Sequence, residues 1–278
     1  MALATSLGLG IGLAFFQEYL DNSIKGADDV TRYLRVPTIG MVPSQGSIGG
    51  KHAYYGSYSA SEGEPESVEA ANASIEFVSF YSPTSVIAEA YRSMRTSLLM
   101  SFPDHPPRTI LVTSAVLSEG KSTTASNVAI SLAQTGSRVA LVDCDMRKPR
   151  IQSIFALGSM PGISSVLTGN ANLKDVCNES SIPDLFVVPC GVVPPNPTEL
   201  LLSTRFQRII SALQEYFDYV VIDSPPLSNV SDARVIAPHA DATLLVVKAW
   251  STSKHAAKHA VTSLASCHAR IAGVVLNN

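Results

Sequence analysis

Short runs of aliphatic residues recur along the chain, separated by longer stretches in which apolar residues return every three or four positions. The runs are typical of buried strands, and the spaced stretches are typical of amphipathic helices. We predict strands at residues 110–113, 139–142, 185–189, 219–223, 242–247 and 271–276, and helices at residues 28–35, 86–99, 122–134, 162–168, 206–216 and 254–268, with a further helix beginning at Pro197. This alternation predicts an α/β fold in which helices flank a mostly parallel central sheet.

The chain opens with an apolar, glycine-rich run at residues 2–16. About 15 residues are fewer than the ~20 that a helix needs to cross a bilayer. A signal peptide would need a basic n-region, which the run lacks, and a buried helix rarely contains so many glycines. Because Lys25, Arg32 and Arg35 follow, we expect the cytoplasmic end of a transmembrane helix whose first part lies outside this chain.

A change in composition separates this beginning from the predicted α/β domain. Residues 44–73 are rich in Ser, Gly, Glu and Ala and contain few aliphatic residues, which is typical of a flexible linker. The linker carries Tyr54, Tyr55 and Tyr58, which we interpret as solvent-exposed side chains. The predicted organisation is a transmembrane-helix end at 1–20, a juxtamembrane segment at 21–43, a linker at 44–80 and a folded domain at 81–278.

Composition narrows the possible partners. The formal net charge of the 278-residue chain is −3, so no general basic field is available to hold nucleic acid. The cysteines are far apart and lack the spacing of metal ligands, which suits a reducing compartment. They are Cys144, Cys177, Cys190 and Cys267.

A candidate phosphate-binding loop joins the strand at 110–113 to the helix at 122–134. It reads Ala115-x-x-x-x-Gly120-Lys121-Ser122, with Ala115 where the general pattern has Gly. In such loops backbone N–H groups wrap the phosphates at a helix N-terminus. Lys121 would supply positive charge to the β and γ oxygens, and the Ser122 hydroxyl would face Mg²⁺. The expected nucleotide contacts are Ser118, Glu119, Gly120, Lys121, Ser122 and Thr123.

Carboxylates end two of the apolar strands. Asp143 and Asp145 follow the strand at 139–142, and Asp223 closes the strand at 219–223. Ligands of open parallel sheets bind at this carboxyl edge, and unneutralised carboxylates there would be costly, so a metal or a cation is expected. An aspartate that closes a strand downstream of a phosphate loop is typically the ligand of a Mg²⁺-bound water.

Two patterns on predicted helices indicate a function less clearly than the phosphate loop and the aspartates do. Glu89, Arg92 and Arg95 share one side of the helix at 86–99, which is compatible with a solvated stripe or with a contact between subunits. His255 and His259 have the spacing of two zinc ligands, but no third ligand accompanies them, which favours a surface helix.

Taken together, the motifs resemble the bacterial tyrosine kinases, the cytoplasmic part of polysaccharide co-polymerases (chain-length determinant proteins). The matching residues are the loop at 115–122, Asp143-x-Asp145-x-Arg147, Val-Val-Ile-Asp223-x-Pro225-Pro226, Glu89-x-x-Arg92-x-x-Arg95, Asn196-Pro-Thr-Glu-Leu-Leu, Leu20-Asp21-Asn22 and Gly273-Val-Val-Leu-Asn277. The resemblance implies a P-loop NTPase fold of the ParA/MinD-like type, with a P-loop tyrosine kinase domain at residues 81–278.

The resemblance also implies roles for single residues. Lys121, Asp143 and Asp145 would be catalytic, with Asp145 as the proposed base for the tyrosine hydroxyl. Ser122, Asp143 and Asp223 would organise Mg²⁺, and Asn277 would join the nucleotide contacts. Glu89, Arg92 and Arg95 would lie between subunits of a homo-oligomeric ring.

The implied function is an ATP-dependent protein-tyrosine autokinase that controls capsule or exopolysaccharide synthesis and export. It would sit at the inner (cytoplasmic) membrane through its N-terminal helix, with the kinase domain on the cytoplasmic side. A non-kinase assembly factor switched by ATP, and a ParA/MinD-like ATPase, are the alternatives. The latter usually carries a second lysine where this chain has Val116. A tyrosine-rich tail is not found before Asn278, so acceptors would be Tyr54, Tyr55 and Tyr58, tyrosines beyond Asn278, or tyrosines of another protein.

Overall fold

The computed structural model describes residues 21–44, 75–102, 105–158, 160–228 and 230–278. The expected transmembrane end at 1–20 and most of the expected linker, with Tyr54, Tyr55 and Tyr58, lie outside these residues. Among the helices that are described, none has both the length and the hydropathy that crossing a bilayer requires.

The described strands form one eight-stranded sheet in the order β1-β8-β7-β2-β6-β3-β5-β4. Every neighbouring pair is parallel except β4 with β5. The strands are β1 (Thr38–Val42), β2 (Thr109–Ser114), β3 (Val139–Asp143), β4 (Asn178–Glu179), β5 (Leu185–Val188), β6 (Tyr219–Asp223), β7 (Ala242–Lys248) and β8 (Ile271–Asn277). The predicted mostly parallel sheet is therefore confirmed.

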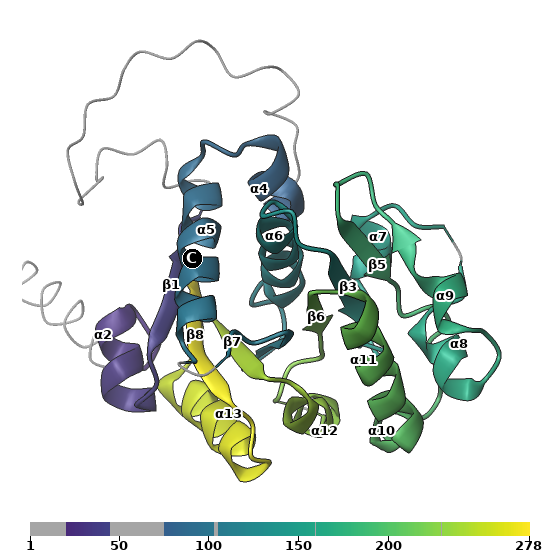
Figure 1. Cartoon of the computed structure of the whole chain (residues 1–278). Coiled ribbons are helices and arrows are strands. Elements are labelled where there is room, and N and C mark those ends of the chain that lie inside the picture. Colours follow the sequence, from purple (N-terminus) through teal and green to yellow (C-terminus); the bar gives the residue numbers. More distant parts are fainter. Residues whose placement is uncertain (1–20, 45–74, 103–104, 159, 229) are drawn as a thin grey trace, which may run out of the picture.

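Helices cover both faces of this sheet (Figure 1). One face carries α2 (Ala27–Asp29), η1 (Val30–Leu34), α8 (Ile163–Thr168), α9 (Leu173–Val176), α10 (Pro197–Leu202), α11 (Thr204–Tyr216), α12 (Asp232–Ile236), η4 (Ala237–His239) and α13 (Lys254–Ser266). The other carries η3 (Ile75–Phe77), α4 (Val78–Tyr81), α5 (Val86–Met100), α6 (Lys121–Ala133) and α7 (Ile151–Ile154).

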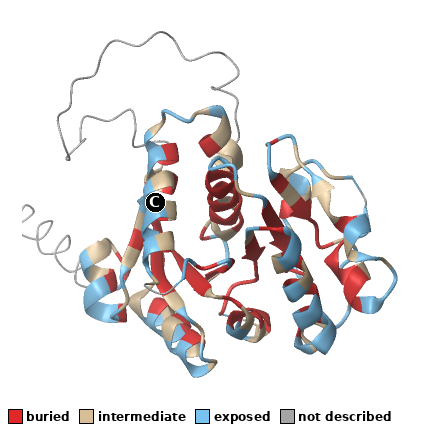
Figure 2. Cartoon of the chain, viewed as in Figure 1, coloured by how far each residue is buried: buried red, intermediate tan, exposed pale blue. Residues whose placement is uncertain are grey.

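The strands are apolar along their whole length because both faces are covered. Successive residues of a strand point to opposite faces, so Leu111 packs in one core while its neighbours Ile110 and Val112 pack in the other. All six residues of β2 are buried. Figure 2 shows the buried residues concentrated in the sheet and on the helix faces turned toward it.

The folded domain reaches further toward the N-terminus than the sequence indicates. Residues 75–81, placed in the expected linker and at its end, form η3 and α4, and Val78 is buried. Asn127 on α6 holds this segment, because its side chain accepts a hydrogen bond from the Ser79 N–H at 3.0 Å and donates one to the Ile75 carbonyl at 2.9 Å. The expected juxtamembrane segment also contributes β1, which pairs with β8.

Candidate active site

The candidate phosphate loop connects the end of β2 to the start of α6, as predicted. Gly120 precedes the helix with a φ of 85°, and Ser118 has a φ of 63°. A Cβ at position 120 would overlap the side-chain amide of Asn277, which donates a hydrogen bond to the Glu119 carbonyl at 2.9 Å. Glycine is therefore required at position 120 by conformation and by space.

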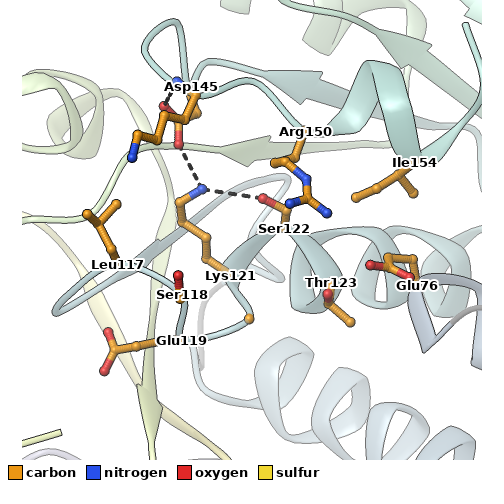
Figure 3. A pocket seen from close by; sticks show the side chains of 12 residues that line it. Glu76, Leu117, Ser118, Glu119, Lys121, Ser122, Thr123, Asp145, Arg150 and Ile154 are labelled. Atoms are coloured by element: carbon orange, nitrogen blue, oxygen red, sulfur yellow. Dashed lines mark hydrogen bonds and ion pairs between the residues drawn. The ribbon is translucent and has the colours of Figure 1, made fainter.

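Glu119 supports the loop from behind. Its carboxylate accepts hydrogen bonds from the Val116 N–H at 2.6 Å, from the Lys248 N–H at 3.2 Å and from the Thr252 hydroxyl. Burial raises the pKa of Glu119. Figure 3 shows this side chain pointing away from Lys121. The expected nucleotide contact at Glu119 is thus left to its backbone, since its side chain ties the loop to the segment that follows β7.

A cavity of about 300 Å³ lies over the loop (Figure 3). Six of the seven expected nucleotide contacts and Asp145 line it, together with residues to which the sequence assigned no role. The lining residues are Glu76, Leu117, Ser118, Glu119, Gly120, Lys121, Ser122, Thr123, Asp145, Lys148, Arg150 and Ile154, so all six loop residues that were expected to contact the nucleotide, and not Asn277, belong to it.

Lys121 joins the loop to two aspartates from different strand ends. Its Nζ lies 2.8 Å from Asp145 Oδ2 and 3.9 Å from Asp223 Oδ1. Burial alone would lower the pKa of Lys121, but the attraction of Asp223 and Asp145 outweighs it, and the pKa is raised. The ammonium group is therefore charged at neutral pH and stands between the loop and the carboxylates.

Asp223 has one occupied and one open carboxylate oxygen. The Ser122 hydroxyl donates a hydrogen bond to Oδ2 at 2.5 Å, whereas among the described residues none donates one to the buried Oδ1. Burial raises the pKa of this carboxyl group. A buried oxygen without a hydrogen bond is costly, and Lys121 Nζ is no nearer to Oδ1 than 3.9 Å. Together with the serine hydroxyl, this oxygen suits Mg²⁺, which takes one or two protein ligands and completes its shell with phosphates and water.

Asp143 lies beside Asp223 in the β3–β6 register but has different partners. Its Oδ1 accepts the Asp145 N–H at 3.1 Å, and its Oδ2 accepts the N–H groups of Arg150 at 3.1 Å and Ile151 at 3.0 Å. Burial, followed by repulsion from Asp223, raises the pKa of Asp143 to about 8. The side chain therefore shapes the loop at 143–151. The three acidic residues and their neighbours do not form a protein-only metal cage among the described residues.

That loop carries the remaining charged groups of the site. Asp145 Oδ1 accepts the Lys148 N–H at 3.0 Å, which leaves Oδ2 for Lys121. Arg147 turns away and binds the buried Asp232 with its Nε at 2.7 Å and its Nη2 at 3.2 Å. The hydrogen bond to Asp232 is the main reason why the pKa of Arg147 is raised.

Sequence reasoning missed Lys148 and Arg150, which line the cavity, and Asp232. The first two had a signal, because they follow the aspartates directly in Asp145-Met-Arg-Lys148-Pro-Arg150. Asp232 had none, since it is separated from Arg147 by 85 positions.

The structure does not gather Glu89, Arg92 and Arg95 with the nucleotide cavity. Glu89 and Arg92 form an ion pair on α5, with Arg92 Nε 2.8 Å from Glu89 Oε2. Arg92 also donates a hydrogen bond to the Pro83 carbonyl at 2.6 Å, and Arg95 donates one to the Ser131 carbonyl on α6 at 2.5 Å. Their expected role between subunits remains a prediction.

Comparison with known proteins places this site in a family. Residues 107–272 match the model of an AAA domain. The chain is 35% identical over 195 residues to the tyrosine-protein kinase YwqD of Bacillus subtilis, covering 70% of this chain and 82% of that protein. It is 37% identical over 190 residues to the tyrosine-protein kinase CpsD of Streptococcus agalactiae, covering 68% and 82%.

The fold comparison agrees. The chimerical protein CapA2B2 has a TM-score of 0.77 to this structure and 29% identity, with 91% of this chain and 98% of that chain covered. Two curated relatives above 30% identity, each covered over most of its length, and a matching fold all point to the family that the motifs resemble. The chain belongs to the bacterial tyrosine-protein kinases.

Proposed function

We propose that this chain transfers the γ-phosphoryl group of Mg·ATP to a protein tyrosine, and that the site over the phosphate loop is where transfer occurs. The single observation that carries the proposal is the position of Lys121. Its ammonium group, charged and nearly buried, lies between the loop that would hold the phosphates and the carboxylates of Asp145 and Asp223. Tyrosine-protein kinase relatives support the reaction class.

The loop supplies the binding part of the mechanism. Its residues line the cavity at the N-terminus of α6, where backbone N–H groups without a partner inside the helix favour an anion. Lys121 would exchange its carboxylate partner for a phosphate oxygen, and Lys148 and Arg150 add positive charge to the same cavity. Ser122 and Asp223 would hold Mg²⁺, with Asp143 beside them. When bound, Mg²⁺ would neutralise charge on the phosphates and help to orient them.

Asp145 is the candidate base. Its Oδ2 is engaged by Lys121 and its Oδ1 by the backbone of the 143–151 loop, which fixes the carboxylate at the cavity wall. Once Lys121 turns to a phosphate, Oδ2 is free to accept the proton of a tyrosine hydroxyl. Base catalysis by a positioned carboxylate typically contributes about 10²- to 10⁴-fold to a rate.

In the cell, the reaction would control synthesis and export of capsular or extracellular polysaccharide. The chain would act in a homo-oligomer at the cytoplasmic side of the inner membrane, with the polysaccharide machinery as its partner and the 1–20 segment as its anchor. The acceptor tyrosines would be those of the 44–73 segment, of a sequence beyond Asn278, or of another protein.

The test is transfer from radiolabelled ATP to a tyrosine-containing copolymer by the full chain, compared with Asp145→Asn. Asp184→Asn, at an exposed position directly before β5, is the matched control. We expect ATP binding by all three proteins, transfer by the wild type and the control, and a loss of about 10²-fold or more in Asp145→Asn. A wild-type chain that binds Mg·ATP and labels no tyrosine would contradict the proposal and favour an ATP-switched assembly factor.

A further inference from the structure

Two exposed aromatic side chains lie among basic residues where the described chain begins. Tyr33, on η1, is 39% exposed and Trp250, after β7, is 64% exposed. Figure 1 places α2 and η1 beside α13, at the sheet edge remote from β4. We call this surface the basic-aromatic patch and define it by Lys25, Arg32, Tyr33, Arg35, Trp250, Lys254 and Lys258.

The cations and the rings of the patch are in direct contact. Lys254 Nζ lies 4.4 Å from the centre of the Tyr33 ring, and the Arg32 guanidinium lies 5.7 Å from the same centre. Lys25 Nζ lies 5.2 Å from the centre of the Trp250 ring. Each ring therefore has a cation over it, a favourable arrangement at exposed sites.

Backbone pairing between distant parts of the chain holds the patch in shape. Residues 22–24 run antiparallel to the segment after β7, with a bridge between Ser23 and Ser253. The Ile24 N–H binds the Thr252 carbonyl at 2.9 Å, and the Trp250 N–H binds the Ile24 carbonyl at 2.8 Å. The Lys254 N–H binds the Asn22 carbonyl at 2.8 Å. The patch is thus a preformed surface that unites residues from both ends of the sequence.

The charge of the patch is opposite to that of the chain. Its five basic residues face three acidic neighbours, and two of these are engaged by Lys25: Asp21 through an ion pair at 3.1 Å and Asp29 through a hydrogen bond from the Lys25 N–H at 2.9 Å. Asp28 is the third. Local charge is therefore positive in a chain whose net charge is −3, which favours an anionic partner.

We propose that the basic-aromatic patch rests on the headgroups of anionic phospholipids. Exposed Trp and Tyr together with Lys and Arg is the side-chain combination found at membrane interfaces. The apolar run at residues 2–16 ends only a few positions before Asp21 in the sequence, so any bilayer that takes up this run lies within reach of the patch. Contact by residues of α13 would orient the kinase domain on the membrane as well as tether it.

Trp250 makes the proposal directly measurable, because it is the sole tryptophan of the chain. The full chain is mixed with phosphatidylcholine vesicles, or with vesicles in which part of the phosphatidylcholine is replaced by phosphatidylglycerol. We expect a blue shift of Trp250 emission and quenching by brominated lipid with the phosphatidylglycerol vesicles. A chain that co-sediments with these vesicles while Trp250 remains as accessible to acrylamide as in buffer would overturn the proposal, since binding would then come from another part of the chain.

Charge variants distinguish binding through the patch from a general attraction between the cations of the chain and anionic vesicles. Lys254→Gln with Lys258→Gln removes two cations from the patch. Lys174→Gln with Arg208→Gln removes two exposed cations from α9 and α11, which lie on the same face but toward the opposite end of the sheet. We expect the first pair to weaken the Trp250-reported binding at least about tenfold, because each basic residue near an anionic surface contributes several-fold. The second pair should leave it unchanged. Equal losses in both, or a Trp250 shift that follows protein concentration without lipid, would contradict a lipid partner.

Discussion

The ends of β3 and β6 contain the same residue in register and use it differently. Asp143 and Asp223 are both fully buried neighbours. At the end of β3, Asp143 accepts hydrogen bonds from three backbone N–H groups. At the end of β6, one oxygen of Asp223 accepts a hydrogen bond from Ser122, and the other receives none from the described residues. A carboxylate at the end of a strand can thus either hold a loop through hydrogen bonds or keep an oxygen available for a cation. Which of the two it does depends on whether backbone N–H groups lie within reach of it.

The largest expected effect that tests this comparison is that of Asp223→Asn. The substitution replaces the carboxylate by a neutral amide, which binds Mg²⁺ more weakly. We therefore expect Mg²⁺ no longer to increase the affinity for the nucleotide, and phosphoryl transfer to fall by about 10²- to 10³-fold. Binding of ATP without Mg²⁺ should persist through Lys121 and the loop. Affinity is measured by titration with and without Mg²⁺, and an unchanged Mg²⁺ dependence would remove Asp223 from the metal site.

Asp143→Ala is expected to act mainly on stability. Three backbone N–H groups of the 143–151 loop lose their acceptor, which should cost about 1–3 kcal/mol of unfolding free energy and loosen Asp145 and Arg150. Denaturant unfolding measures the loss. If the Asp143→Ala protein is as stable as the wild type but its nucleotide affinity no longer rises with Mg²⁺, the main role of Asp143 is to bind the metal ion. In that case it does not mainly hold the 143–151 loop.

The pH dependence of stability sharpens the same contrast. Burial raises the pKa of Asp143 from 3.8 to about 8, so between these values the folded chain holds a proton that the unfolded chain has released. The contribution of Asp143 to the free energy of unfolding should therefore be largest below pH 3.8 and should decline as the pH rises toward about 8. Urea unfolding across this range should show a shallower decline in Asp143→Asn, and the same slope in both proteins would refute the assignment.

A smaller effect is expected behind the phosphate loop. Thr252→Val keeps the shape of the side chain but removes the hydroxyl that binds the buried Glu119, which should cost about 1–2 kcal/mol and weaken ATP binding modestly. Thr262→Val, an exposed position on α13, is the control and should stay within about 0.5 kcal/mol of the wild type. If both variants behave alike, the link between Thr252 and Glu119 does not hold the loop.

The sequence predicted the features that depend on local pattern. Six of the strands, the phosphate loop and the aspartates at strand ends follow from apolar runs and from residue spacing, and the structure has each of these six strands within a few residues of its predicted position. The turn at Pro197 also begins a helix as expected, although Asn196 caps it without a side-chain hydrogen bond to the helix backbone.

What the sequence did not predict depends on contacts between distant residues. Whether an oxygen of Asp143 is free depends on where the N–H groups of Arg150 and Ile151 lie, and the direction of Glu119 depends on Thr252. The two-residue β4 and the helical turns at 75–81 are too short for a periodic signal. Their order comes from tertiary partners such as Asn127.

A crystal structure with Mg²⁺ and a non-hydrolysable ATP analogue would test the proposed roles of Lys121, Asp223 and Asp143 most directly. We predict that Lys121 Nζ leaves Asp145 Oδ2 for a phosphate oxygen, that the metal ion lies against Ser122 and Asp223, and that Asp143 keeps its three backbone partners. An analogue bound elsewhere, with the ion pair between Lys121 and Asp145 intact, would contradict these roles.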